Sequence, residues 1–127
     1  MDLEPVKVVR VITRLNIGGP AIHAILLSTK MDPERFSTCL VTGEPEATEG
    51  DLSHFAQGPQ VRLMRLKSLA RPIRPLADLR SLMQLFRIIS TERPQVLHTH
   101  MAKAGALGRL AGLLYNRVGP GRSPGRR

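Results

Sequence analysis

Two histidines and a lysine lie close together in the chain, where an apolar segment passes into a glycine-rich one. His98 and His100 are two residues apart, so on a strand running through 95–99 they should project from the same face at its carboxyl end. A helix can begin near Ala102, and its free amide groups favour anions. Lys103 would add a positive charge beside a phosphate, or would be an ordinary solvated lysine. In α/β proteins this strand-to-helix junction is where ligands bind.

A second candidate is the sequence RLNIGGP, over residues 14–20, which follows the β-branched run Val8–Thr13. The backbone at Gly18 and Gly19 can come close to a ligand and can adopt conformations that are costly for other residues. A tight turn between a strand and a helix explains the same dipeptide equally well. The spacing matches neither the dinucleotide fingerprint nor the phosphate-binding P-loop.

Metal and thiol chemistry have weak support in this sequence. His98 and His100 form a single His-x-His pair, with no carboxylate or cysteine cluster around it, so no metal site is predicted. Cys39 is the one cysteine and lies within an apolar run, which predicts a small buried residue. A lone cysteine also excludes an intrachain disulfide.

The hydrophobic pattern predicts an α/β fold, a Rossmann-like parallel sheet with flanking helices. Strands are expected over 8–13, 36–42, 61–66 and 95–99. Helices are expected from Pro20 to before Asp32, from Asp51 through Gln57, over 76–91, and from near Ala102 to Val118. Right-handed crossovers should connect the parallel strands.

The predicted helices differ in the faces they should bury. Each face is defined by apolar or small residues at helical spacing. The expected buried positions are Ile22, Ile25 and Leu26 in the first helix, Leu79, Leu82, Met83, Phe86 and Ile89 in the long one, and Ala104, Gly105, Gly108, Ala111 and Gly112 in the last. The small residues should let the last helix lie close to the sheet.

Length and composition indicate one domain over residues 1–118, followed by a disordered basic Gly/Pro/Arg tail over 119–127. The first residues carry Asp2 and Glu4 before a strand-like run, which does not resemble a secretory signal. No apolar stretch is long enough to span a bilayer. We therefore expect a cytoplasmic protein, with the option of contact with the inner face of the membrane.

Basic residues are concentrated between Arg62 and Arg87, where seven cations accompany the single acid Asp78. Such a region suits an anionic membrane or a lipid phosphate, although a solvated surface explains it as well. The chain has no Trp and only one Tyr and three Phe. It therefore lacks the aromatic platform typical of single-stranded nucleic-acid binders, and no nucleic-acid partner is predicted.

Both candidate segments together resemble the amino-terminal half of a family 4 glycosyltransferase of the GT-B fold. In that family an apolar first strand runs into a Gly-Gly loop, and a later strand ends in His-Thr-His before a segment like MAKAGALGR. Both motifs occur here in the same order, and the resemblance spans roughly residues 7–117. It implies transfer of a sugar from a nucleotide-sugar donor, as co-substrate, to an acceptor such as a lipid-linked or polysaccharide precursor. It implies no metal and no further cofactor.

The resemblance also implies roles for individual residues. Gly18, Gly19 and Asn16 fall in the loop that approaches the donor diphosphate and the acceptor. His100 resembles the catalytic histidine that reaches the reacting sugar, with His98 beside it as a structural or substrate-binding partner. Lys103 is expected to bind the substrate because of its position in the first turn of the last helix, whereas His23, which matches a family position just beyond the glycines, is expected to be a packed residue.

The ending GPGRSPGRR departs from the family, in which another buried strand follows. The family's donor-binding half lies in a carboxyl-terminal domain, so the fragment alone is expected to be inactive. The alternatives are a noncatalytic truncated remnant, left by a frameshift or early stop, and the acceptor-binding subunit of a split enzyme. The expected partner is accordingly a missing donor domain or a separate chain.

Overall fold

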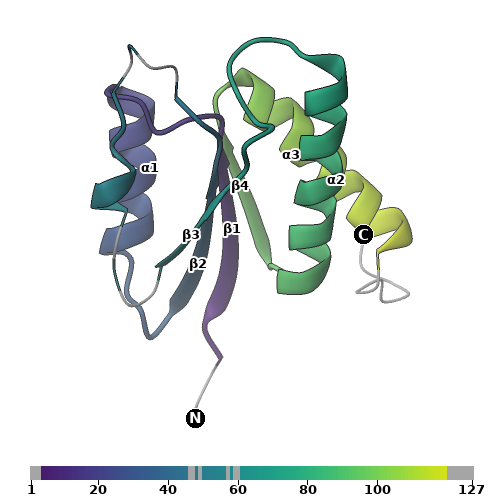
Figure 1. Ribbon diagram of the computed structural model, residues 1–127. Coiled ribbons are helices and arrows are strands. Elements are labelled where there is room, and N and C mark those ends of the chain that lie inside the picture. Colours follow the sequence, from purple (N-terminus) through teal and green to yellow (C-terminus); the bar gives the residue numbers. More distant parts are fainter. Residues whose placement is uncertain (1–3, 46–47, 49, 57, 59–60, 120–127) are drawn as a thin grey trace.

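The computed structural model describes residues 4–45, 48, 50–56, 58 and 61–119. Strands and helices alternate along the chain, as predicted, and form an α/β fold (Figure 1). The elements are β1 (Val6–Ile12), α1 (Gly19–Lys30), β2 (Phe36–Thr42), the 3-10 helix η1 (Ser53–Phe55), β3 (Val61–Arg65), α2 (Pro75–Glu92), β4 (Val96–His100) and α3 (Ala102–Val118). The predicted tail lies outside these residues except for Gly119, so the division at residue 118 stays a prediction.

The four strands form one parallel sheet in the order β3-β2-β1-β4. Helix α1 covers one face, and α2 and α3 lie together on the other (Figure 1). Because all strands are parallel, their carboxyl ends meet at one edge of the sheet, at the top of Figure 1. The helices α1 and α3 both begin at this edge, where both candidate segments were predicted to lie.

Strand β4 is less buried than a central strand of a parallel sheet would be. It pairs with β1 and is an edge of the sheet that the described residues form. Val96 is 44% exposed, and the remaining residues of the strand are only partly buried. An apolar run alone does not distinguish an edge strand from a central one, because both carry aliphatic residues on the covered face.

Two apolar clusters lie on the two faces of β1. Val9 and Val11 point toward α2 and α3, where they join Leu85 and Ile89. Ile12 belongs to a second cluster under α1. Cys39 is buried in the first cluster, as expected, and burial raises the pKa of its thiol to about 11, so it stays protonated and unreactive.

The buried faces of two helices differ from the prediction. On α1, Ile25 is buried but Ile22 and Leu26 are about half exposed, because the small residues Ala21, Ala24 and Ser28 occupy the contact with the sheet. On α2, Leu79 and Met83 are each 55% exposed. The sheet side of α2 instead presents four buried residues, which are Ser81, Leu85, Ile88 and Ile89. The Ser81 hydroxyl is satisfied by that of Ser68 at 2.7 Å, which makes its burial inexpensive.

The small-residue face of α3 is confirmed. A Cβ at Gly108 would lie 2.6 Å from the Thr99 side chain, and one at Gly112 would lie 2.9 Å from Leu97. These glycines let the helix backbone lie directly on β4. The sequence between residues 51 and 57 was predicted to be a short helix, and the structure has only the single turn η1 there, with the Asp51 carboxylate accepting the Ser53 amide at 2.8 Å.

One glycine outside the candidate site tests this packing. A Cβ at Gly43 would lie 1.9 Å from the Leu69 carbonyl oxygen and 2.4 Å from that of Thr13, and backbone atoms cannot move aside as a flexible side chain can. We predict that Gly43→Ala lowers the free energy of unfolding by about 3 kcal/mol. The matched variant Gly19→Ala, where the new Cβ has no neighbour within 4 Å, should lose nothing. Urea unfolding of both variants is the measurement, and equal losses would contradict this packing.

Candidate active site

At the end of β4, before the turn into α3, consecutive side chains lie on opposite faces of the sheet. Thr99 faces α3, where it lies against Gly105 and Gly108. His98 and His100 point to the opposite face, and the His100 ring lies 5.7 Å from that of His23 on α1. Lys103 instead reaches α2. Alternation along β4 therefore places Thr99 on one face of the sheet and the two histidines on the other.

The histidines form a cluster over the sheet edge. The rings of His98 and His100 are 4.3 Å apart between centroids, which confirms that they share one face. The Nε2 atom of His100 is buried and has no hydrogen-bond partner among the described residues. Burial, then the neighbouring His98, Arg10 and His23, lowers the pKa of His100 to about 4. The ring is accordingly neutral at physiological pH and keeps one nitrogen unused.

A buried arginine holds this cluster, and the sequence reasoning missed it. Arg10 is 3% exposed at the middle of β1 and pairs in register with His98. Its Nε donates to Nδ1 of His98 at 3.1 Å, and a guanidinium NH₂ group donates to the Ser28 hydroxyl at 2.9 Å. No carboxylate among the described residues pairs with it. The sequence did contain a signal for this role: Arg10 is the one cation within the β-branched run Val8–Thr13, which is typical of a central, buried strand.

His23 does not lie as predicted. It was expected to pack on the apolar face of its helix, but its side chain is exposed and meets the cluster at the rim. Within the described part of the chain, no group of three or more His, Cys, Asp and Glu side chains is arranged to hold a metal ion.

The Gly18-Gly19 loop precedes α1 at the same edge. Gly18 has φ of 173°, which is extended backbone open to any residue, and Gly19 is the first residue of α1. Neither glycine has a φ in the left-handed region that favours glycine. The conformational freedom invoked from the sequence is therefore not required here, and what the glycines provide is open space. Beside them, the buried Oδ1 of Asn16 has no hydrogen-bond partner among the described residues.

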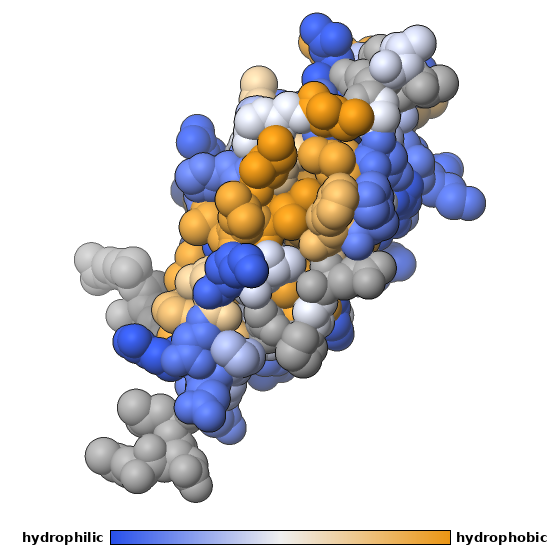
Figure 2. All heavy atoms as spheres, turned by 90° about the vertical axis from the view of Figure 1, so that its left-hand side faces the viewer, coloured by the Kyte–Doolittle hydropathy of each residue, from blue (hydrophilic) through white to orange (hydrophobic). Residues whose placement is uncertain are grey.

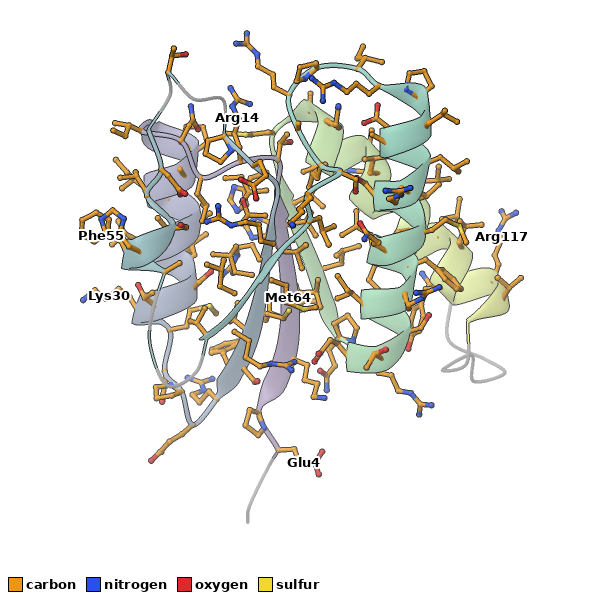
Figure 3. The ribbon with its side chains drawn as sticks, in the orientation of Figure 1. Glu4, Arg14, Lys30, Phe55, Met64 and Arg117 are labelled. Carbon is orange, nitrogen blue, oxygen red and sulfur yellow. The ribbon has the colours of Figure 1, made fainter. Side chains whose placement is uncertain are left out.

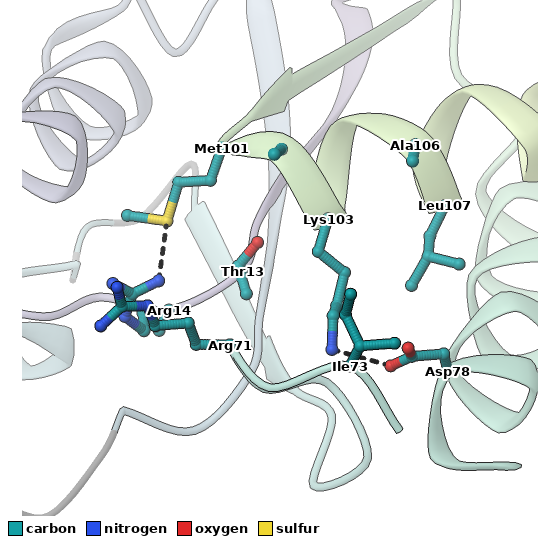
Figure 4. A pocket seen from close by; sticks show the side chains of 10 residues that line it. Thr13, Arg14, Arg71, Ile73, Asp78, Met101, Lys103, Ala106 and Leu107 are labelled. Atoms are coloured by element: carbon teal, nitrogen blue, oxygen red, sulfur yellow. Dashed lines mark hydrogen bonds and ion pairs between the residues drawn. The ribbon is translucent and has the colours of Figure 1, made fainter. Parts of the chain in front are cut away.

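A cavity of about 560 Å³ opens on the other side of the edge, between β1, α3 and the segment before α2 (Figure 4). Thr13 and Arg14 line it from the end of β1, Arg71 lines it from the segment before α2, and Met101 and Lys103 line it from the start of α3. Arg14 lies at the carboxyl edge of the sheet in Figure 3. Lys103 was predicted from the sequence as a site residue, whereas Arg14 and Arg71 were not.

Lys103 is neither solvated nor free to meet a phosphate by itself. Its side chain is 12% exposed, and its ammonium group donates to the Asp78 carboxylate at 2.9 Å and to the Pro72 carbonyl (Figure 4). The lysine therefore ties the start of α3 to the start of α2. With Arg14 and Arg71, the cavity holds three cations and one carboxylate, an arrangement that favours an anion.

Strain is concentrated at the turn that leads into α3. Met101 has φ of 72° and ψ of 158°, a backbone conformation in which side chains are strained. The Thr13 hydroxyl accepts the Ala104 amide at 3.1 Å and so takes up one free amide of the helix start. The arrangement fixes the first turn of α3 against β1, beside the cavity.

Comparison with known proteins decides the family. Residues 18–119 match the family described as glycosyl transferase 4-like domain. The chain belongs to that family. Over 81 residues it is 37% identical to UDP-Gal:alpha-D-GlcNAc-diphosphoundecaprenol alpha-1,3-galactosyltransferase of Escherichia coli, a match that covers 64% of this chain and 20% of the relative. No solved structure gives a significant match.

Family membership confirms the resemblance and the α/β fold class predicted from the sequence. The matched region contains Gly18, Gly19 and the His98–His100 turn, whereas Asn16 lies just before it. The roles of Asn16, Gly18 and Gly19 remain predictions, as does catalysis by His100. The alignment spans about a fifth of the relative, so this chain corresponds to part of such an enzyme.

Removing the buried arginine should change the titration of its histidine. Burial, then the charges of Arg10 and His23, lowers the pKa of His98, and the bond from Arg10 also favours its neutral form. We predict that Arg10→Met raises the His98 pKa toward the usual value of 6.5, measured by NMR titration of the ring protons. Ser28→Ala, which leaves the Arg10–His98 bond, is the control and should change it less. An unchanged pKa in Arg10→Met would refute the role of Arg10.

The neutral histidines also predict how stability depends on pH. The folded-state pKa of His100 is about 4, below its usual 6.5, so between these values the unfolded chain binds a proton that the folded chain does not. The free energy of unfolding should therefore be largest above pH 6.5 and should decrease as the pH falls toward 4. His100→Asn should reduce this decrease, whereas His54→Asn, at an exposed position, should not. Urea unfolding at pH 7, 6, 5 and 4 is the measurement, and equal slopes in both variants would count against it.

Proposed function

We propose that this domain is the acceptor-side half of a glycosyltransferase that moves a sugar from a nucleotide-sugar donor to a lipid-linked diphosphate acceptor. Family membership supports the reaction class. The name of the E. coli relative supports the acceptor class, because that protein acts on a sugar joined to diphosphoundecaprenol. We place the work of the enzyme at the cytoplasmic face of a membrane.

The observation that carries this proposal is the cationic cavity at the carboxyl edge of the sheet. Arg14 and Arg71 bring guanidinium groups to it, and α3 begins at its wall. Guanidinium groups and helix amide groups are the common partners of phosphate oxygens. A cavity of about 560 Å³ is in the range of small-molecule sites and has room for a diphosphate and its attached sugar.

The residues around this edge divide the work of the reaction. Arg14, Arg71 and the first turn of α3 hold the acceptor diphosphate, and the glycine loop leaves space for the reacting groups. The neutral His100 offers an unused ring nitrogen to a sugar hydroxyl, and its ring lies against that of His98, which Arg10 holds through a hydrogen bond. The donor's departing diphosphate needs a second wall, which belongs to the part of the relative that the alignment does not cover.

Binding of an acceptor analogue tests the proposal without requiring catalysis. The probe is a water-soluble N-acetylglucosamine diphosphate carrying a short prenyl chain, titrated by calorimetry against the chain as it stands. We expect saturable binding that Arg14→Gln weakens about tenfold, the loss of one charge-assisted contact. Arg35→Gln is the control, since Arg35 is exposed before β2, at the opposite end of the strands.

Two results would contradict the proposed function. One is absence of binding by a chain that remains folded, which would favour a noncatalytic remnant. The other is binding that Arg14→Gln and Arg35→Gln weaken equally, which would place the ligand elsewhere. If binding occurs as expected, sugar transfer can then be sought by adding a donor-binding domain as a separate chain. Activity in that mixture would identify the chain as the acceptor-binding subunit of a split enzyme.

A further inference from the structure

In the segment before α2 and in the first turns of that helix, several large aliphatic side chains are exposed to an unusual degree. Ile73 is 86% exposed and Leu76 is 84% exposed. Leu79 and Met83 follow at helical spacing and are each 55% exposed. Contiguous exposed aliphatic residues mark an interaction surface more often than a freely solvated one.

Cations surround these aliphatic residues and have no carboxylate partners among the described residues. Arg71 and Arg74 flank Ile73, and Lys67 and Arg80 line a hollow with Leu76. The acid in this region, Asp78, is bound to Lys103 and so does not offset their charge. The surface thus combines apolar side chains with a positive rim.

The predicted basic region between Arg62 and Arg87 is therefore not one surface. Arg62 pairs with Glu92, and Arg65 pairs with Glu44 at 3.4 Å and with Asp51 at 3.2 Å. These two cations lie on β3 and are largely neutralised. The remaining cations lie around α2, and it is there that the exposed aliphatic residues occur.

This surface adjoins the cavity. Arg71 and Ile73 line the cavity and belong to the exposed segment as well. The segment and the start of α2 lie at the carboxyl edge of the sheet, at the top of Figure 1. A lipid-linked acceptor could therefore place its diphosphate in the cavity while its hydrocarbon chain stays in a bilayer against the same edge. Among the described residues no helix is both long and apolar enough to cross a membrane.

We propose that this surface, which we call the α2 tip and define as Lys67, Arg71, Ile73, Arg74, Leu76, Leu79 and Arg80, docks on an anionic lipid bilayer. The inference rests on the proposed function and adds to it the surface that faces the membrane. The aliphatic side chains enter the interface, and the cations contact lipid phosphates. Binding by the exposed cations weakens as salt screens them.

A second apolar patch serves as the control. Ile17, Ile22, Leu26 and Phe55 are also exposed, and apolar side chains gather over α1 in Figure 2. The hollow beside Leu26 is lined by one lysine and no arginine. This patch has comparable apolar exposure, its hollow is lined by fewer cations than the hollow at Leu76, and it lies over the other face of the sheet.

Sedimentation with vesicles tests the proposal. The probes are vesicles of phosphatidylcholine alone and of phosphatidylcholine with 30% phosphatidylglycerol, about a third anionic lipid as on cytoplasmic surfaces. We expect binding to the anionic vesicles that falls about tenfold in Leu76→Gln/Leu79→Gln and in Arg74→Gln/Arg80→Gln. The control Ile22→Gln/Leu26→Gln should bind as the unchanged chain does. None of these six residues lines the cavity.

The results separate the docking surface from the proposed function. Equal binding to both vesicle types, or equal loss in the control and the tip variants, would overturn the α2 tip as the docking surface. The short-chain acceptor analogue is titrated against the same variants, and its affinity should not change. If the analogue binds but the vesicles do not, the docking surface is wrong and the proposed function stands. If the vesicles bind and the analogue does not, the proposed function fails while the α2 tip remains a lipid-binding surface.

Discussion

The parallel pairing of β1 with both β2 and β4 is the constraint on which the rest of the molecule depends. It aligns the carboxyl ends of the strands, so loops that are about 80 residues apart in the chain meet at one edge. Alternation along β1 then divides that edge. Arg10 and Ile12 face α1, whereas Val9 and Val11 face α2 and α3. The histidine cluster and the cationic cavity are consequences of this division.

A buried cation without a carboxylate partner is expensive, so its position calls for a reason. The guanidinium group of Arg10 donates hydrogen bonds to neutral acceptors, which are the ring nitrogen of His98 and the hydroxyl of Ser28. A carboxylate in their place would neutralise the guanidinium, but it would also favour protonated histidines nearby. With only neutral acceptors, the positive charge of Arg10 adds to burial, the larger effect, in lowering the pKa values of His98 and His100. Burial of Arg10 lowers the stability of the fold but gives the neighbouring histidines a defined protonation state. Perturbed pKa values of this kind are common at functional sites.

Much of the fold could be predicted because hydrophobic periodicity reports element type directly. Seven of the expected elements lie within a few residues of their predicted positions, from β1 to α3. The periodicity was less informative about which face is buried, since α1 and α2 each carry more aliphatic residues than their contact with the sheet can cover. Leu79 and Met83 were assigned to the core for that reason, and the structure leaves them exposed. The burial of Ser81 could not be predicted, because it depends on Ser68, a residue outside the helix.

The location of the candidate site could be predicted from the sequence. The separation of the histidine cluster from the cationic cavity could not. The motifs identified the right edge, because residues at the ends of parallel strands must gather there. That Lys103 would bind Asp78 depended on the packing of α2 against α3, which no local pattern encodes. Arg71 and Ile73 were likewise invisible as site residues, since they belong to an irregular segment whose path is set by tertiary contacts.

If the cavity binds the acceptor and the α2 tip docks on a bilayer, the residues that they share would connect the two events. Arg71 and Ile73 belong to both, so a bilayer that orders this segment also orders one wall of the cavity. By thermodynamic linkage, an acceptor that fixes the same wall must then strengthen docking to the same degree. An acceptor with a diphosphate head and a hydrocarbon chain would contact both surfaces at once. Presentation of the acceptor at the membrane would in this way reduce the ordering that the protein must supply when it binds.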